Sequence, residues 1–260
     1  MQMTEKMIKN YLEHHFEPNP NDDVKTQPQY GTSFRRRVSG LPVRNANQPA
    51  SAGGCLVNEI LCGWACVGAR AQVIEDGMLR RAAQLGLLVT EQAVRPDYHV
   101  CLLHPAGHTG SERVASVAPR LLAWCGHVVG PELPLWPSAA DFLQSLADAS
   151  APRLAALDGL FALALLDERT RSLVLAADPF GMQPLYFARC GKGLVFSSSA
   201  DLILRSLPGP ITLNPTAAAE YLHFHYCLGD KTLANEVERL PQGCALTLHL
   251  DEGRVQCDRL

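Results

Sequence analysis

The hydrophobic positions divide the chain into two unlike parts. Residues 1–54 are poor in large apolar side chains after Phe16 and rich in Asn, Pro, Gln, Ser and Gly, so they bury too little surface to offset chain entropy. We therefore expect residues 1–54 to be a mostly disordered N-terminal extension, with one short amphipathic helix in "TEKMIKNYLEHHF". From Cys55 onward the pattern is that of a single packed domain covering residues 55–260.

Apolar runs of strand length recur through this second part. The run "CLVNEILCGWACVG" predicts a pair of buried strands, and "YHVCLLHP" and "RLLAWCGHVVG" each predict one short strand. The stretch "GLFALALLDERTRSLVLAADP" predicts a hairpin whose turn is Asp167–Ser172, and "GCALTLHLDEGRVQCDRL" predicts a closing hairpin. "LVFSSSADLILRSL" predicts a strand that leads into a helix.

Helical spacing appears between these runs. "GMLRRAAQLGLL" predicts a helix whose apolar side carries Leu79, Ala82, Ala83 and Leu85–Leu87. "SAADFLQSLADAS" predicts a helix with a Ser N-cap, and "NPTAAAEYLHFHY" predicts one with Asn214 as its cap. Strands and helices interleave without a regular βαβ order, which favours an α+β sandwich of mostly antiparallel strands.

Composition excludes several classes of function. A net charge of −3 and a single short basic cluster give no footprint for nucleic acid. No apolar run reaches the roughly 18 residues of a membrane span, so we expect a cytoplasmic protein without a membrane partner.

Nine cysteines without a CxxC pair fit reduced thiols better than disulfides or a zinc ribbon. His223, His225 and Cys227 alternate near a helix end and do not face together, so no metal site is expected.

Three segments carry a family resemblance: "LDGLFALALLDERTRSLVLAADPFGMQPLYF", "LVFSSSADLIL" and "LNPTAAAEYLHFHYCLGDKTLANEVERLPQGCALTL". In this order they closely resemble the N-terminal class II glutamine amidotransferase domain of the asparagine synthetase B-like family, which includes asparagine synthetases, β-lactam synthetases and lasso-peptide cyclases. The resemblance covers roughly residues 55–260. It implies an Ntn-hydrolase-like four-layer sandwich of two mostly antiparallel sheets between helices.

The resemblance also implies a nucleophile and a carboxylate-binding group. Active members begin with a Cys whose free α-amine takes the thiol proton. "CGWACVG" resembles that opening strand and places Cys62 at the nucleophile, but behind 61 residues. Either those residues are removed, or Cys62 is an inert core thiol. Arg113 in "SERVASV" corresponds to the Arg that holds the substrate carboxylate; alternatively it is a surface strand residue.

Other positions depart from the family pattern. "WCGHVVG" resembles the strand that carries Asn-Gly-Glu in the family, so Cys125 replaces the Asn, Gly126 is retained and His127 replaces the Glu. A thiol is a weaker donor than a carboxamide, so the oxyanion hole would lack one strong hydrogen bond. Ala139 stands where relatives carry the Asp that receives the substrate ammonium, unless Asp141 has shifted into its place.

The "DPFG" loop follows the first predicted hairpin. Here Pro179 should fix φ, Gly181 should take a positive φ and Asp178 should accept backbone N–H groups, which together make a turn. In the family this loop lies near the glutaminase pocket, so the resemblance makes Asp178 a candidate substrate-binding residue as well. The Arg that usually precedes the motif is Ala177 in this chain.

These departures predict a domain without glutaminase activity, which serves as a scaffold or docking module for an ATP-dependent amide-forming synthetase or cyclase. A peptide substrate is a further expected partner. ATP and Mg²⁺ are expected in the synthetase domain or partner and no cofactor in this chain, which has no Walker A or Ser-Gly-Gly-x-Asp-Ser sequence. Two alternatives stay open: an active glutaminase that supplies ammonia after cleavage before Cys62, and an N-terminal fragment of a longer asparagine synthetase-like enzyme.

Overall fold

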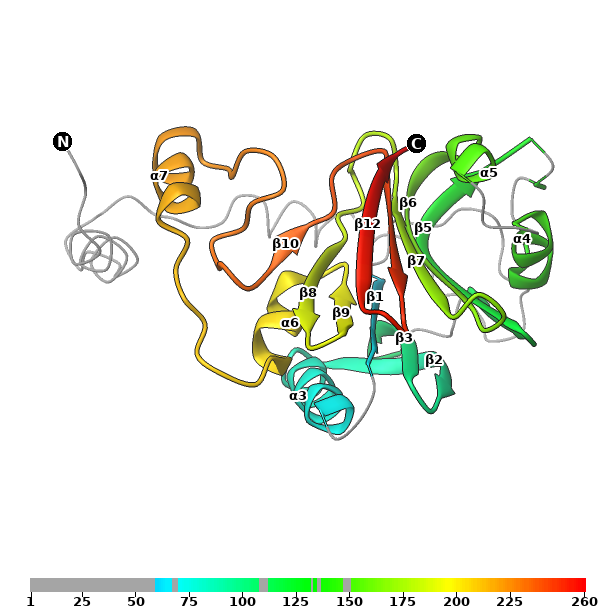
Figure 1. Cartoon of the computed structure of the whole chain (residues 1–260), viewed down its shortest axis with the longest axis horizontal. Helices are drawn as coiled ribbons and strands as arrows, with labels where there is room; N and C mark the ends of the chain where they lie inside the picture. Colours follow the sequence, from blue (N-terminus) through cyan, green and yellow to red (C-terminus); the bar gives the residue numbers. More distant parts are fainter. Residues whose placement is uncertain (1–58, 67–69, 108–111, 132, 135–136, 147–150) are drawn as a thin grey trace, which may run out of the picture. The chain divides into compact units, whose positions relative to one another are not determined.

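The computed structural model describes residues 59–66, 70–107, 112–131, 133–134, 137–146 and 151–260 (Figure 1). The disorder and the short helix expected in residues 1–54 lie outside these ranges. One sheet contains β1 (Ile60–Ala65), β2 (Leu87–Arg95), β3 (Tyr98–Pro105), β8 (Tyr186–Cys190), β9 (Gly193–Ser197) and β10 (Glu238–Arg239). The other contains β4 (Val114–Val117), β5 (Arg120–Val129), β6 (Asp158–Asp167), β7 (Ser172–Ala177), β11 (Cys244–His249) and β12 (Arg254–Arg259).

The strand orders within the described residues are β10-β8-β9-β1-β3-β2 in the first sheet and β12-β11-β7-β6-β5-β4 in the second. All pairings between these strands are antiparallel. Strand β1 is central in its sheet because it pairs with both β3 and β9. Strands β5 and β6 pair over ten residues each, from Arg120 opposite Asp167 to Val129 opposite Asp158. These two strands form the longest ladder of the second sheet.

Helices cover the outer faces of both sheets. Helix α3 (Arg70–Gln84) and helix α6 (Ala200–Ser206) bury Ile74 and Leu202 against the first sheet, in a cluster that also holds Trp64. Helix α4 (Ala139–Ser145) and helix α5 (Ala151–Ala155) cover the second sheet. The Phe142 ring of α4 meets Trp124 of β5 edge-on, with ring centroids 5.0 Å apart. The expected four-layer α+β sandwich is therefore confirmed.

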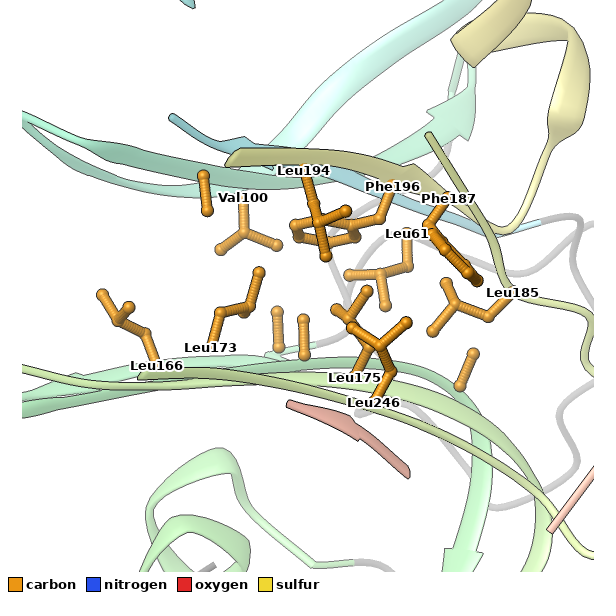
Figure 2. Packing of buried hydrophobic residues seen from close by; sticks show 14 of the residues in the cluster. Leu61, Val100, Leu166, Leu173, Leu175, Leu185, Phe187, Leu194, Phe196 and Leu246 are labelled. Carbon is orange, nitrogen blue, oxygen red and sulfur yellow. The ribbon is translucent and has the colours of Figure 1, made fainter. Parts of the chain in front are cut away.

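The main core lies between the two sheets. Figure 2 shows Leu61, Val100 and Phe196 of the first sheet facing Leu166, Leu173, Leu175 and Leu246 of the second. Strand β6 is apolar at nearly every position because both of its faces are buried. Ala162 and Ala164 point to the inter-sheet core, whereas Phe161, Leu163 and Leu165 belong to the cluster under α4 and α5.

Two local predictions are wrong. The run before Gly68 forms one described strand, β1, instead of a strand pair, and its partners β3 and β9 come from much later in the chain. Helix α3 begins at Arg70 and ends at Gln84, so Leu85–Leu87 do not extend its apolar face. Gly86 has a φ of 71°, the left-handed conformation that ends helices, and Leu85 is 45% exposed.

Ala83, predicted on the apolar side of helix α3, is exposed, whereas Ala82 is buried. The hairpins and the helix caps are confirmed. The two hairpins are β6–β7 and β11–β12. Ser138 and Asp141 form a capping box at the start of α4. Asn214 caps α7 (Pro215–Phe224), with Pro215 as the first helical residue.

Candidate functional site

Cys62 lies in the middle of the first sheet, opposite Cys101 on β3 and Ser197 on β9. Its side chain is fully buried and belongs to the cluster between this sheet and the helices α3 and α6. The Sγ atoms of Cys62 and Cys101 are 3.2 Å apart. The hydrogen bond with Cys101, followed by burial, raises the pKa of the Cys62 thiol well above its ordinary value. The thiol is therefore protonated at neutral pH and is a poor nucleophile.

Cys125 of β5 lies on the other side of the first sheet, in the inter-sheet core, and is also fully buried. The Gln183 amide donates to its Sγ atom across 3.1 Å. Burial raises the pKa of this thiol to about 11, and the hydrogen bond from Gln183 opposes part of that rise. The cysteine that the resemblance places at the family Asn position is thus a neutral thiol that accepts a hydrogen bond, with little capacity to stabilise an oxyanion.

Gly126 follows Cys125 in a conformation that only glycine adopts easily. Its φ is 88°, and a Cβ atom built there would lie 2.0 Å from the carbonyl oxygen of Leu160 on the paired strand. The Gly126 N–H points to the Glu59 carboxylate, with 3.3 Å between nitrogen and Oε2. The backbone donor that the resemblance assigns to the oxyanion hole is therefore present and has a carboxylate as its partner.

Arg113 contacts the same carboxylate. Its Nη1 atom donates to Glu59 Oε2, and the two side chains are 25% and 5% exposed. The backbone N–H of Arg113 donates to Glu91 Oε2 across 2.7 Å, and Val114 N–H donates to the same oxygen across 3.1 Å. Glu91 thus fixes the backbone from which the Arg113 guanidinium projects.

His104 completes the surroundings of Glu59. Its Nε2 atom lies 3.2 Å from Glu59 Oε1, and its Nδ1 atom lies 2.7 Å from the Thr90 hydroxyl. The imidazole is 1% exposed. Thr90 faces His104 because β2 has a register irregularity between Val89 and Glu91. If Nε2 carries the proton, the ring donates to Glu59 and accepts from Thr90, so both nitrogens are used.

Asp178 is fully buried, and its carboxylate organises the loop after β7. Oδ1 accepts from the backbone N–H groups of Phe180 and Met182, at 2.9 and 3.1 Å. Oδ2 accepts from the backbone N–H of Gln183 at 2.8 Å. Gly181 has the expected positive φ of 63°. The predicted turn is confirmed, and Asp178 positions Gln183, which in turn contacts Cys125.

The other predicted positions lie apart from these groups. His127 pairs with Leu160 in the β5–β6 ladder and is half-buried. Ala139 begins α4, and Asp141 is occupied by the capping box, where Ser138 Oγ donates to it across 2.7 Å. Ala139 and Glu91 both border an open hollow of about 630 Å³. The capping box uses Asp141 Oδ2, and the Asp141 side chain is exposed.

The structure brings Arg113 and Gly126 together on one carboxylate and places Cys125 beside the loop of Asp178. Cys62 faces the opposite side of its sheet from Cys125. Three residues that contact the candidate site were missed from the sequence: Glu59, His104 and Gln183. Glu59 is 54 residues from Arg113 and 67 from Gly126, and Gln183 is 58 residues from Cys125, so nothing in the local sequence marks those contacts.

A second hollow, of about 630 Å³, lies between α6, α7 and residues 211–234. Apolar or aromatic side chains on or near it are partly exposed: Ile211, Tyr221, Tyr226 and Leu233. His225 caps the end of α7 with a φ of 63°. Within the described residues no group of three or more His, Cys, Asp or Glu is placed to hold a metal ion. The helices of that same part of the chain are too short or too polar to cross a membrane.

Comparison with known proteins gives the following similarities. Residues 142–259 match the family model described as the glutamine amidotransferase domain. Proteins of Mycobacterium bovis and Mycobacterium tuberculosis, named as proposed glutamine-hydrolyzing asparagine synthetases, are each 35% identical over 99 residues. The aligned stretch is 37% of this chain and 15% of each relative, so the chain matches only a small part of their length.

Two solved structures are similar in chain trace. One is glutamine phosphoribosylpyrophosphate amidotransferase from B. subtilis complexed with ADP and GMP, with 13% identity and a TM-score of 0.45 over 77% of this chain and 49% of that chain. The other, described as the allosteric regulatory enzyme of purine biosynthesis, has the same identity and TM-score and is covered over 48% of its length.

Proposed function

We propose that this chain is a class II glutamine amidotransferase domain of an asparagine synthetase-like system. The family-model match over residues 142–259 and the distant similarity to glutamine-hydrolyzing asparagine synthetases support this. The domain, with the residues ahead of Cys62 attached, does not hydrolyse glutamine. It serves instead as a scaffold or docking module for an ATP-dependent, amide-forming synthetase or cyclase. ATP and Mg²⁺ act in that synthetase, and a peptide is its candidate substrate.

One observation carries the first half of the proposal: Cys62 is a fully buried thiol inside a central strand. Glu59 to Leu61 precede it in the chain, so its nitrogen is part of a peptide bond and cannot accept a proton. The contact with Cys101 also raises the pKa of the Cys62 thiol, which further lowers its reactivity as a nucleophile. Cys62 therefore has no base to take its proton, stays protonated and lies out of contact with solvent. These three properties support the proposal that the glutaminase site is inactive.

The Cys125 position supports the same conclusion. A carboxamide that donates to an oxyanion is typically worth a factor of 10²–10³ in rate. Here Cys125 is a neutral thiol that accepts from Gln183. The retained Gly126 N–H would therefore act alone, and its distance of 3.3 Å to Glu59 shows that it already has a partner.

The docking role is supported by exposed apolar side chains on two segments. Phe180 and Met182, in the loop after β7, are 67% and 66% exposed. Tyr226 is 59% exposed beside the hollow at α7. Large exposed apolar side chains that lie close together are typical of protein contacts. We expect the protein isolated from its native cell to co-purify with an ATP-consuming, amide-forming subunit; isolation of the chain alone would contradict the docking role.

The inactive-site proposal can be tested by labelling with diazo-oxo-norleucine, a glutamine-mimicking electrophile. Intact mass of the untreated protein should first show that residues 1–61 are present. We expect no adduct on Cys62 after hours at neutral pH, whereas iodoacetamide should label Cys62 once the protein is unfolded. A stoichiometric diazo-oxo-norleucine adduct on Cys62 of the intact chain would overturn the proposal.

One specific observation favours a second candidate, an active glutaminase released by cleavage before Cys62. Arg113 and the Gly126 N–H remain in place around a carboxylate, although other family positions are replaced. Cleavage would turn the Cys62 nitrogen into a free amine, with a pKa of about 7.7–8.0 that suits a general base. Detection of a native form that begins at Cys62, with glutamate release, would favour this candidate.

A further inference from the structure

Three groups from separate segments of the chain converge on the Glu59 carboxylate: Gly126 of β5, His104 of β3, and Arg113, which directly precedes β4. Arg113 Nη1 and the Gly126 N–H donate to Oε2, and His104 Nε2 lies 3.2 Å from Oε1. The Glu59 side chain is 5% exposed. A carboxylate withdrawn from water to this degree needs a guanidinium or several hydrogen-bond donors, and this one has both.

Each of the three donors is held in place without Glu59. Glu91 accepts from the backbone N–H groups of Arg113 and Val114, which fixes the start of β4. Thr90 contacts His104 Nδ1 across 2.7 Å. Gly126 is set by its pairing with Phe161 and by its positive φ. The Arg113 backbone, the His104 ring and the Gly126 N–H are therefore positioned by contacts other than Glu59, and the Arg113 guanidinium reaches the carboxylate from this fixed backbone.

We propose that these three groups form an anion site of which Glu59 is a tethered ligand, and that the chain ahead of Cys62 thereby blocks the site to free carboxylates. Arg113 remains 25% exposed, so the site borders solvent on the guanidinium side. Glu59 lies three residues before Cys62, and Leu61 is fixed by Ser198, whose Oγ accepts from Leu61 N–H at 3.1 Å. A cut between Leu61 and Cys62 would break the covalent link between the tethered carboxylate and the part of β1 that begins at Cys62.

The vacated site would take a small carboxylate, either a simple acid or the carboxylate of a free amino acid. The inference deepens the proposed function, since it concerns the same part of the domain, but it requires only binding and no hydrolysis. A plain structural ion pair is the competing explanation. It predicts that removing Glu59 destabilises the fold and that no added anion repairs the damage.

The experiment measures thermal unfolding of the full chain and of a Glu59→Ala variant, with acetate as the probe and chloride at equal ionic strength as the control. The variant should unfold at a lower temperature because the Arg113 guanidinium loses its partner. Acetate at tenfold its dissociation constant should raise the variant's midpoint by about 3–6 °C relative to chloride. The unaltered chain, whose site is filled, should show no difference between acetate and chloride.

Two matched variants define the specificity. Glu59→Ala combined with Arg113→Met should lose the acetate effect, because the cation that holds the anion is gone. Glu75→Ala removes the carboxylate that lies 3.3 Å from His99 Nδ1 and should show no acetate effect, because the cation-capable partner at that position is an imidazole and the described residues form no guanidinium pair with Glu75. Equal acetate effects in all variants, or none in Glu59→Ala, would overturn the proposal.

A second measurement covers the case in which Glu59→Ala does not fold in chloride. Refolding yield should then rise with acetate for Glu59→Ala and stay unchanged for the double variant; equal yields in acetate and chloride would overturn the proposal. The result is separable from the proposed function. Acetate rescue of Glu59→Ala together with glutamate release by that variant, in which the site is open, would refute the inactive-glutaminase proposal alone. Failed rescue without glutamate release would refute the tethered ligand alone.

Discussion

Replacing Asp178 by Asn should destabilise the domain by about 2–4 kcal/mol, although the two side chains have nearly the same shape. The carboxylate accepts from three backbone N–H groups, those of Phe180, Met182 and Gln183, at 2.8–3.1 Å. Asn has one acceptor oxygen, so its NH₂ group must face at least one of these donors. A hydrogen bond to a charged group is worth about 1.5–3 kcal/mol, and a buried donor left without a partner adds about 1–3 kcal/mol.

The assay is urea unfolding, compared with the matched Asp201→Asn variant. Asp201 forms an ion pair with Arg81 at 2.6 Å, but its side chain is 40% exposed, so its loss should cost less than about 1 kcal/mol. The urea slope should be the same in both variants, which shows that the same surface is exposed on unfolding. If Asp178→Asn is no more destabilising than Asp201→Asn, the carboxylate does not organise the loop and the account of Asp178 is wrong.

The other predictions concern the core, the β5 glycine and alkaline pH. Phe161→Ala should cost about 3–5 kcal/mol, because the side chain is 1% exposed; an unchanged melting midpoint would make β6 peripheral. Gly126→Ala should cost about 2–5 kcal/mol, more than Gly107→Ala, whose φ is also positive but whose Cβ would meet no atom within 4 Å. Burial raises the pKa of Cys125 from 9.0 to about 11, so the unfolded chain loses this proton at a lower pH than the folded chain. The free energy of unfolding should therefore fall by up to about 2–3 kcal/mol between pH 9 and 11. The fall should be smaller in Cys125→Ala.

The fold could be predicted where local patterns determine structure. The hairpin β6–β7 has two apolar strands separated by a polar turn, and the helix caps at Ser138 and Asn214 are local signals. The strand pair expected before Gly68 failed because β1 obtains its partners from β3 and β9, which no local pattern reveals. Apolarity alone indicates burial and does not identify the neighbour.

The candidate site was predictable only in part. Gly126 and Arg113 could be selected by resemblance, but their common partner Glu59 is separated from them by 67 and 54 residues. Side chains alternate along β1, so Leu61 points to the inter-sheet core and Cys62 points to the helices α3 and α6. Cys125 of the other sheet lies in the inter-sheet core, and only the packing of the two sheets determines this. Asp178 was predicted as a turn residue. Its carboxylate also accepts from the Gln183 backbone N–H, which places the Gln183 amide beside Cys125, and this tertiary contact is not visible in the local sequence.

Glutamate release from glutamine by the purified full chain tests the central claim most directly. With residues 1–61 attached, the unaltered chain and a Cys62→Ala variant should both give no more glutamate than the buffer blank, because Cys62 lies buried within a strand. Glutamate release by the unaltered chain that disappears in Cys62→Ala would contradict the account.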